Sequence, residues 1–257
     1  MRTNAGTGFG IAMLLAASTV FGQGTSLNRS EVAALKSKIV AVQTAMGADP
    51  AGYLKKEESY NLPTDFRPAR EDGKYWPVTA SVSLRYTDRA TAEGTANLEK
   101  MQEEFQAKYA SALASGNPEA ITKMAEEATR MQAAAMAVAM NPAAKKEDMT
   151  VSVQLNVNSS TGIDPDAVVL ERPGVIVLRN KRDLADTRGE MTVYADPVAL
   201  KATEELSKVE LRTADNGVAN RSGVYHVVIR INGTLADAET WAKTFDYPAI
   251  LAVIDRQ

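Results

Sequence analysis

The sequence predicts an α+β fold in which a mostly antiparallel sheet carries helices on one face and an inserted helical hairpin. Apolar and polar residues alternate along 78–86 and again along 149–158, which is typical of strands with one face on a core and one in water. A parallel sheet would instead show continuous apolar runs. Between these strands lie two helical segments, over 89–115 and 118–140. Beyond them, short apolar stretches predict further strands.

The composition is that of a soluble globular protein and argues against several classes of function. The 257 residues, of which 45% are hydrophobic and 24% charged, suffice for one large domain or two small ones. The formal net charge of -3 and the absence of a long basic run argue against nucleic-acid binding. The chain has no cysteine and one histidine, His226, so a structural zinc site lacks its ligands. We therefore expect no cofactor and no metal.

Residues 1–22 are interpreted as a secretory signal. Arg2 precedes a mostly apolar stretch from Ile11 to Phe21, and we expect cleavage near Gly22. The stretch is shorter than the roughly 20 apolar residues of a membrane span, so we expect no transmembrane segment in the mature chain. Export without cysteine suits a bacterial periplasmic or secreted protein. The alternative is a segment that is retained as an N-terminal anchor.

The mature chain is expected to begin with a helix and an extended strap over 23–74. Ser30 is the predicted helix cap and Gly47 the predicted stop. The apolar residues of this helix fall on one face, which must dock on something; they are Val32, Leu35, Ile39, Val42 and Met46. The segment 49–75 is rich in aromatic residues, so we expect a strap that packs on the domain surface. Residues 75–257 are assigned to one α+β domain.

The helical hairpin at 89–140 follows the rules for helix ends. The first helix ends at Gly116, Asn117 caps the second, and Pro118 takes its first position, where proline is favoured. The second helix stops at Asn141-Pro142. One face of the first helix is apolar; it carries Leu98, Met101, Phe105, Tyr109 and Ala112.

After the second alternating strand the chain becomes rich in strands. A short helix is expected over 197–206 and another over 236–245, with Trp241 and Phe245 turned inward. The segment Asp215-Asn-Gly217 predicts a turn. The expected strands are Ala167–Leu170, Val175–Leu178, Met191–Tyr194, Val209–Arg212, Val224–Ile231 and, after Pro248, Ala249–Ile254.

Four methionines lie in the second helix of the hairpin, and thioether sulfur favours monovalent copper. At about 100° per residue, Met124 and Met131 share one face with other apolar residues, which indicates a core stripe. Met136 and Met140 form a separate pair where the helix is apolar all round. We expect this end to be buried; the alternatives are a surface for a partner or hydrophobic ligand, and a copper site.

His226 and Arg230 fall on the wetter face of one predicted strand, about 13 Å apart. We expect a solvated strand histidine, with an anion- or substrate-binding face as the alternative. Asp164 and Asp166 flank a proline before a strand, and without the spacing of a calcium loop they indicate a polar turn.

No nucleophile elbow, SxxK pair or phosphate-binding loop occurs in the chain. The sequence therefore predicts an exported, non-catalytic envelope protein that acts as a structural, interaction or binding module. Its expected partner is an envelope protein or a hydrophobic ligand, and its polar strand faces could bind a polymer. One alternative is a hydrolase whose acidic residues converge only in the fold. The other is a hydrophobic-ligand or copper carrier built on the hairpin.

Overall fold

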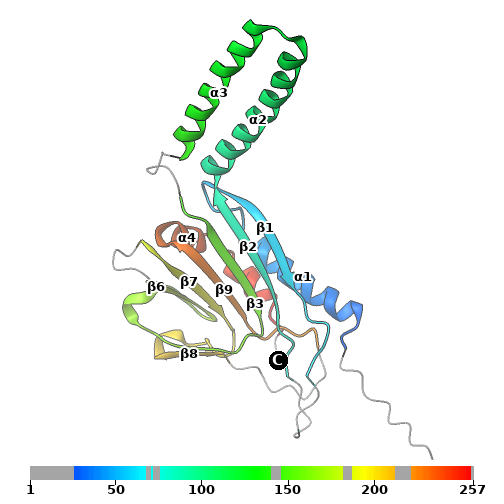
Figure 1. Ribbon diagram of the computed structural model, residues 1–257. Coiled ribbons are helices and arrows are strands. Elements are labelled where there is room, and N and C mark those ends of the chain that lie inside the picture. The colour runs from blue at the N-terminus through cyan, green and yellow to red at the C-terminus, as the bar shows by residue number, and fades with distance from the viewer. Residues whose placement is uncertain are drawn as a thin grey trace, which may run out of the picture.

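The computed structural model confirms a mixed α+β fold with one large antiparallel sheet (Figure 1). It describes residues 26–67, 71, 76–139, 146–181, 187–211 and 221–255. In spatial order the seven strands are β1 (Tyr53–Asn61), β2 (Ala80–Asp88), β3 (Met149–Leu155), β9 (Val227–Thr234), β7 (Arg188–Ala195), β6 (Val175–Lys181) and β5 (Val168–Arg172).

The core lies on the sheet face that the short helices cover. Each strand contributes every second residue to this face, and the register aligns these residues across the strands. One such row consists of Val82, Val153, Ile229, Val193 and Val177, all of them buried. The helices that cover this face are α1 (Arg29–Ala45), α4 (Leu235–Ala242) and α5 (Tyr247–Ala252).

The other face of the sheet is covered only in part. The two-stranded sheet of β4 (Ser159–Gly162) and β8 (Lys208–Leu211) and the 3-10 helices η1 (Pro165–Ala167) and η2 (Thr203–Glu205) lie near β5 and β6. Val209 and Leu211 of β8 pack there against Ile176, Leu178 and Val228. Along β2 and β3 this face remains polar and exposed to half-buried, as the alternation predicted; it carries Ser81, Ser83, Arg85, Thr150, Ser152 and Gln154.

The inserted hairpin joins two neighbouring strands of the sheet. It consists of α2 (Arg89–Ser115) and α3 (Pro118–Ala139), and it extends from one end of the sheet, away from the other helices (Figure 1). Asp88 is both the last residue of β2 and the N-cap of α2, so no loop separates strand from helix. Gly116 ends α2 with a φ of 61°, and the Asn117 side chain accepts a hydrogen bond from the Glu119 N–H at 3.0 Å, as predicted.

The C-terminal element was predicted as a strand, and this prediction was wrong. Residues Tyr247–Ala252 form the helix α5. The side chain of Asp246 caps it by accepting a hydrogen bond from the Ala249 N–H at 3.0 Å. Pro248 lies in the first turn, where its missing N–H has no consequence. The Asp-x-Pro pattern is therefore a helix start, which the apolar run after it concealed.

Other boundaries differ by a few residues. Asn28, not Ser30, caps α1, because Glu31 completes a capping box with it. Part of the predicted strap forms the edge strand β1. The helix expected over 197–206 is reduced to turns and η2. The predicted signal over 1–22, the helix stop at 141–142 and the turn at 215–217 lie outside the described residues.

Candidate functional site

The hairpin has only a small interface of its own. Met124 and Met131 of α3, predicted to be core residues, are only half-buried, and Lys108 Nζ of α2 lies 2.5 Å from Glu127 Oε1 of α3. Ala112 is the one buried residue of α2, and no residue of α3 whose burial is described is buried. The two helices therefore leave much of their surface to solvent.

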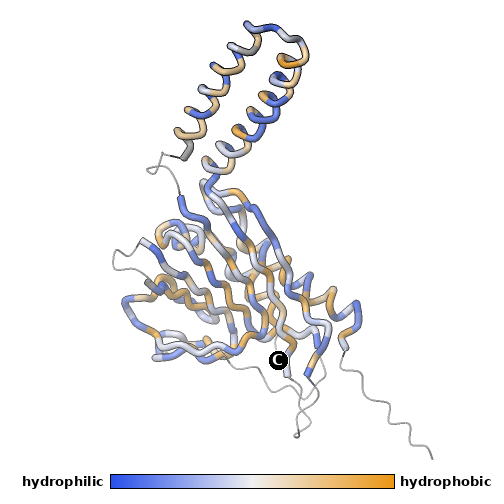
Figure 2. Tube along the Cα trace, in the orientation of Figure 1, coloured by the Kyte–Doolittle hydropathy of each residue, from blue (hydrophilic) through white to orange (hydrophobic). Residues whose placement is uncertain are grey.

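Met136, in the all-apolar end of α3, is not buried, which contradicts the prediction for this residue. Its side chain is 54% exposed, because the sheet domain does not reach this part of the hairpin. Met101, Tyr109 and Leu113 of α2 are also exposed large hydrophobic residues, and Figure 2 shows hydrophobic positions recurring along both helices. Met140 lies outside the described residues. Since Met124 and Met131 are half-buried, while Met136 is exposed and lies about 120° round the helix from Met124, these three sulfur atoms do not gather into one copper site.

His226 is fully buried, so the expectation of a solvated strand histidine was wrong. Its Nε2 atom lies 2.6 Å from the Val157 carbonyl oxygen, and Nδ1 has no hydrogen-bond partner among the described residues. Burial lowers the pKa of the ring, partly opposed by the hydrogen bond to Val157 and the charge of Asp196. Alternation along the strand assigned the correct face, but it does not reveal what covers that face.

Arg230 does not form a joint site with His226. It is half-buried, its guanidinium donates to the Gln154 side chain, and its Nε lies 4.0 Å from Glu190 Oε1. Thr192 donates to the same carboxylate at 3.0 Å. Arg230 thus belongs to a polar network on the open sheet face, whereas the His226 ring is enclosed.

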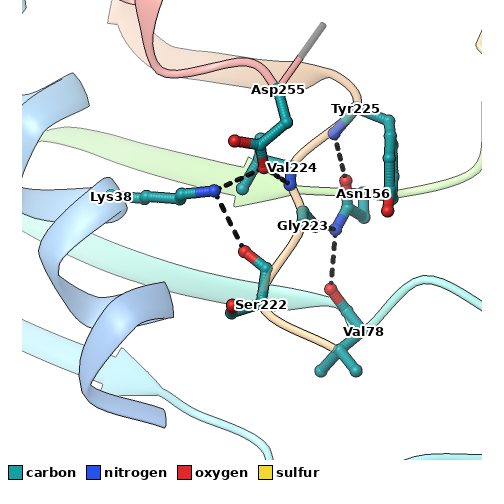
Figure 3. Close-up of polar contacts among 8 residues, drawn as sticks. All are labelled: Lys38, Val78, Asn156, Ser222, Gly223, Val224, Tyr225 and Asp255. Atoms are coloured by element: carbon teal, nitrogen blue, oxygen red, sulfur yellow. Dashed lines mark hydrogen bonds and ion pairs between the residues drawn. The ribbon is translucent and has the colours of Figure 1, made fainter. Parts of the chain in front are cut away.

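A second polar cluster holds together the end of the sheet that lies away from the hairpin, and sequence reasoning missed it (Figure 3). Asn156 is buried with a φ of 58°, a conformation that asparagine tolerates better than most residues. Its Nδ2 donates to the carbonyls of Val78 and Gly223 at 2.9 and 2.7 Å, and its Oδ1 accepts from the Tyr225 N–H at 2.8 Å. Both amide donors of Asn156 are used and its Oδ1 accepts one bond, so the side chain joins three chain segments and has no donor left for a ligand.

The same end of the molecule is held by Asp255. Lys38 of α1 donates to Asp255 Oδ2 at 2.5 Å and to the Ser222 carbonyl at 3.1 Å, and the Val224 N–H donates to the same carboxylate oxygen (Figure 3). A pocket of about 490 Å³ adjoins Asn156, with Phe66 and Trp76 in its wall. The polar contacts drawn there are structural, since all of them except the Lys38–Asp255 ion pair satisfy a backbone group.

A smaller groove lies between α1 and β1 and gathers several polar side chains that are hydrogen-bonded to one another. Its volume is about 300 Å³. Glu58 accepts hydrogen bonds from Lys55 at 2.8 Å, Tyr60 at 2.5 Å and Gln43 at 3.2 Å. The donors Lys55 and Tyr60 hold the pKa of Glu58 at about 2, while burial and the Glu58 charge raise the pKa of Tyr60 to about 12.

Two carboxylates, Asp49 and Glu58, line this groove, and sequence reasoning did not pair them. A hydrolase of the acid–base type needs one carboxyl group whose pKa is raised so that it can donate a proton. Glu58 shows the opposite shift and stays ionised at neutral pH. The arrangement around Glu58 therefore suits binding better than proton transfer.

Within the described ranges, no group of three or more histidine and acidic side chains is placed to hold a metal ion. None of the helices described has the length and apolar character to cross a membrane. Comparison with protein-family models, curated proteins and solved structures finds no match to the chain.

Proposed function

We propose that this protein is an exported, non-catalytic binding module of the bacterial envelope, and that the helical hairpin is the arm with which it contacts a partner protein. The observation that carries the proposal is the exposure of large apolar side chains on a hairpin that projects from the sheet (Figure 1). Four of the seven exposed large hydrophobic side chains that are described lie on this hairpin, and apolar side chains that gather in one exposed region mark interaction sites.

The chemistry of the exposed residues supports a protein partner. Methionine adapts to irregular surfaces, and tyrosine combines an apolar ring with a polar hydroxyl, so both suit binding surfaces. Tyr109 stacks on Phe105 with ring centroids 6.0 Å apart, which presents a broad aromatic surface on α2. Leu113, near the end of α2, and Met136, near the end of α3, are further exposed apolar side chains of the arm.

The base of the arm is held firmly on the sheet. The Arg89 N–H donates to the Gly52 carbonyl at 2.9 Å, and its guanidinium donates to the Tyr53 carbonyl at 3.3 Å. Together with the direct passage from β2 into α2, these contacts fix the direction of the first helix. A fixed arm pays less conformational entropy on binding than a free one. The export part of the proposal is supported by residues 1–22 of the sequence.

Site-specific photocrosslinking tests the proposal. A photoreactive residue placed at Leu113 is expected to capture a discrete partner in cells, because the side chain there is 52% exposed on the arm. The matched control is Val198, an apolar side chain that is 76% exposed on the sheet domain. Crosslinked products of equal abundance from both positions, or none from Leu113, would contradict the proposal.

A further inference from the structure

The groove between α1 and β1 has the size of a small-molecule site. Its volume of about 300 Å³ lies at the lower end for ligand pockets and suits a single ring better than a peptide segment. Leu84, Tyr86 and Trp241 are the buried apolar residues beneath it. The Tyr86 and Trp241 rings meet edge to face with centroids 5.5 Å apart, so the floor is rigid.

The polar wall of the groove is arranged before any ligand arrives. Lys55 and Tyr60 of β1 and Gln43 of α1 all donate to Glu58, which fixes their positions relative to one another. The Tyr60 hydroxyl also lies 3.1 Å from Gln43 Oε1. The Lys55 ammonium carries three donors and the Glu58 carboxylate about four acceptor sites, so capacity for further bonds remains. Fixed donors and acceptors side by side match hydroxyl groups, which donate and accept at once.

The charge of the residues that line the groove favours a cationic ligand over an anionic one. Asp49 and Glu58 are negative and Lys55 is positive, so the lining carries a net charge of -1. Lys55 is paired with Glu58 at 2.8 Å, and the charge of the exposed Asp49 helps to raise the pKa of Lys55 and also acts on the neutral Tyr86 hydroxyl. Lys36 lies over the Tyr60 ring, 4.8 Å from its centroid, outside the residues that line the groove. The lining therefore disfavours phosphates and carboxylates and favours a cationic group at Asp49.

We propose that this groove binds an amino sugar, a polyhydroxylated ring that carries an ammonium group. Asp49 accepts from the ammonium group, and Glu58 with Tyr60 and Gln43 bonds the ring hydroxyls. The groove and the hairpin share no residues, so this proposal stands independently of the proposed function.

Isothermal titration of the full mature chain tests the site. The probes are the trimer of glucosamine, its N-acetylated form, the trimer of glucose and the ring-free amine spermidine. We expect saturable binding of the glucosamine trimer, and binding about tenfold weaker for the two neutral sugars, because they lack the charged donor for Asp49. No saturable binding of the glucosamine trimer, equal binding of a neutral sugar, or equal binding of spermidine overturns the proposal.

Three variants locate the binding. Asp49→Asn and Glu58→Gln are each expected to weaken glucosamine-trimer binding about tenfold. The control is Glu57→Gln, on the neighbouring residue of β1, whose side chain is 62% exposed and faces Arg85 on the other side of the sheet. Asp49 is an exposed residue after α1, so its substitution is compatible with folding even if that of Glu58 is not. Unchanged affinity in Asp49→Asn, or the same loss in the control, overturns the assignment.

Discussion

His226 is a fully buried histidine whose two ring nitrogens have different surroundings. Nε2 donates to the Val157 carbonyl at 2.6 Å, so the neutral ring carries its proton there. Nδ1 has no partner among the described residues, and a proton on it would place an unpaired charge in the interior. The ring is therefore held neutral, and it titrates below the range of an exposed histidine, which makes it sensitive to acid.

We expect the free energy of unfolding to fall as the pH is lowered through about 6.5. The unfolded histidine takes up a proton there, whereas the folded one, with its lowered pKa, does not. The free energy of unfolding then falls by up to about 1.4 kcal/mol per pH unit, and this decrease stops below the pKa of His226 in the folded protein. Urea unfolding at several pH values should show a shallower dependence for His226→Gln, which retains an N–H for Val157. Identical pH dependence in both proteins would show that His226 is not responsible.

At the scale of elements, the junction of β2 and α2 depends on one carboxylate. Asp88 accepts from the Thr91 N–H at 2.9 Å and from the Thr91 hydroxyl at 2.8 Å, which satisfies one of the free N–H donors of the first helical turn. The residue is also paired with Tyr53 in the sheet. Asp88 therefore fixes the direction of α2 relative to β2.

We expect Asp88→Ala to cost about 1 kcal/mol, the usual loss for an N-cap. The effect should concentrate in the first turns of α2, where amide hydrogen exchange accelerates. The control is Glu99→Ala, in the exposed middle of α2, for which little change is expected. If exchange accelerates throughout the sheet to the same degree, the role of Asp88 as a local cap is wrong.

Local patterns predicted most elements because each rested on short-range chemistry. The alternation in β2 and β3 and the Gly116, Asn117 and Pro118 sequence are such patterns. The helix α5 and the cap of α1 were misjudged although their signals are local, whereas the misjudged side chains of the candidate sites depended on contacts between distant segments. Burial of His226 requires the carbonyl of Val157, and exposure of Met136 follows from where the hairpin points. Similarly, the pairing of Asp49 with Glu58 in one groove arises from the packing of α1 on the sheet, which no spacing encodes.

At the scale of the whole molecule, we expect the sheet domain to fold without its arm. Since Tyr86 pairs with Met149, replacing residues 89–145 by Asn-Gly leaves Thr87 and Asp148 joined by five residues, namely Asp88, Asn, Gly, Lys146 and Glu147. The shortened protein should unfold cooperatively, with a midpoint within a few degrees of the full chain, and should lose the crosslinks of the arm. Thermal unfolding followed by circular dichroism measures this.

A variant with a cavity in the core provides a reference for the stability of the shortened protein. Leu35→Ala, at a fully buried position of α1, should cost about 2–5 kcal/mol by leaving a cavity. A shortened protein that is less stable than Leu35→Ala would show that the hairpin is part of the structural core. That result would also weaken the interpretation of the hairpin as a surface devoted to a partner.

The insertion of the hairpin between paired strands also bears on the order in which the chain folds. Tyr86 and Met149 are neighbours in the sheet but far apart in sequence, and closing so long a loop of disordered chain is entropically costly and slow. Helices form within about a microsecond, well before long-range strand pairing. Once α2 has folded back on α3, the two ends of the insertion lie close together, and β2 meets β3 almost as if a tight turn joined them. We therefore expect the hairpin to speed the pairing of β2 with β3, which would otherwise be among the most remote strand pairings in the sheet.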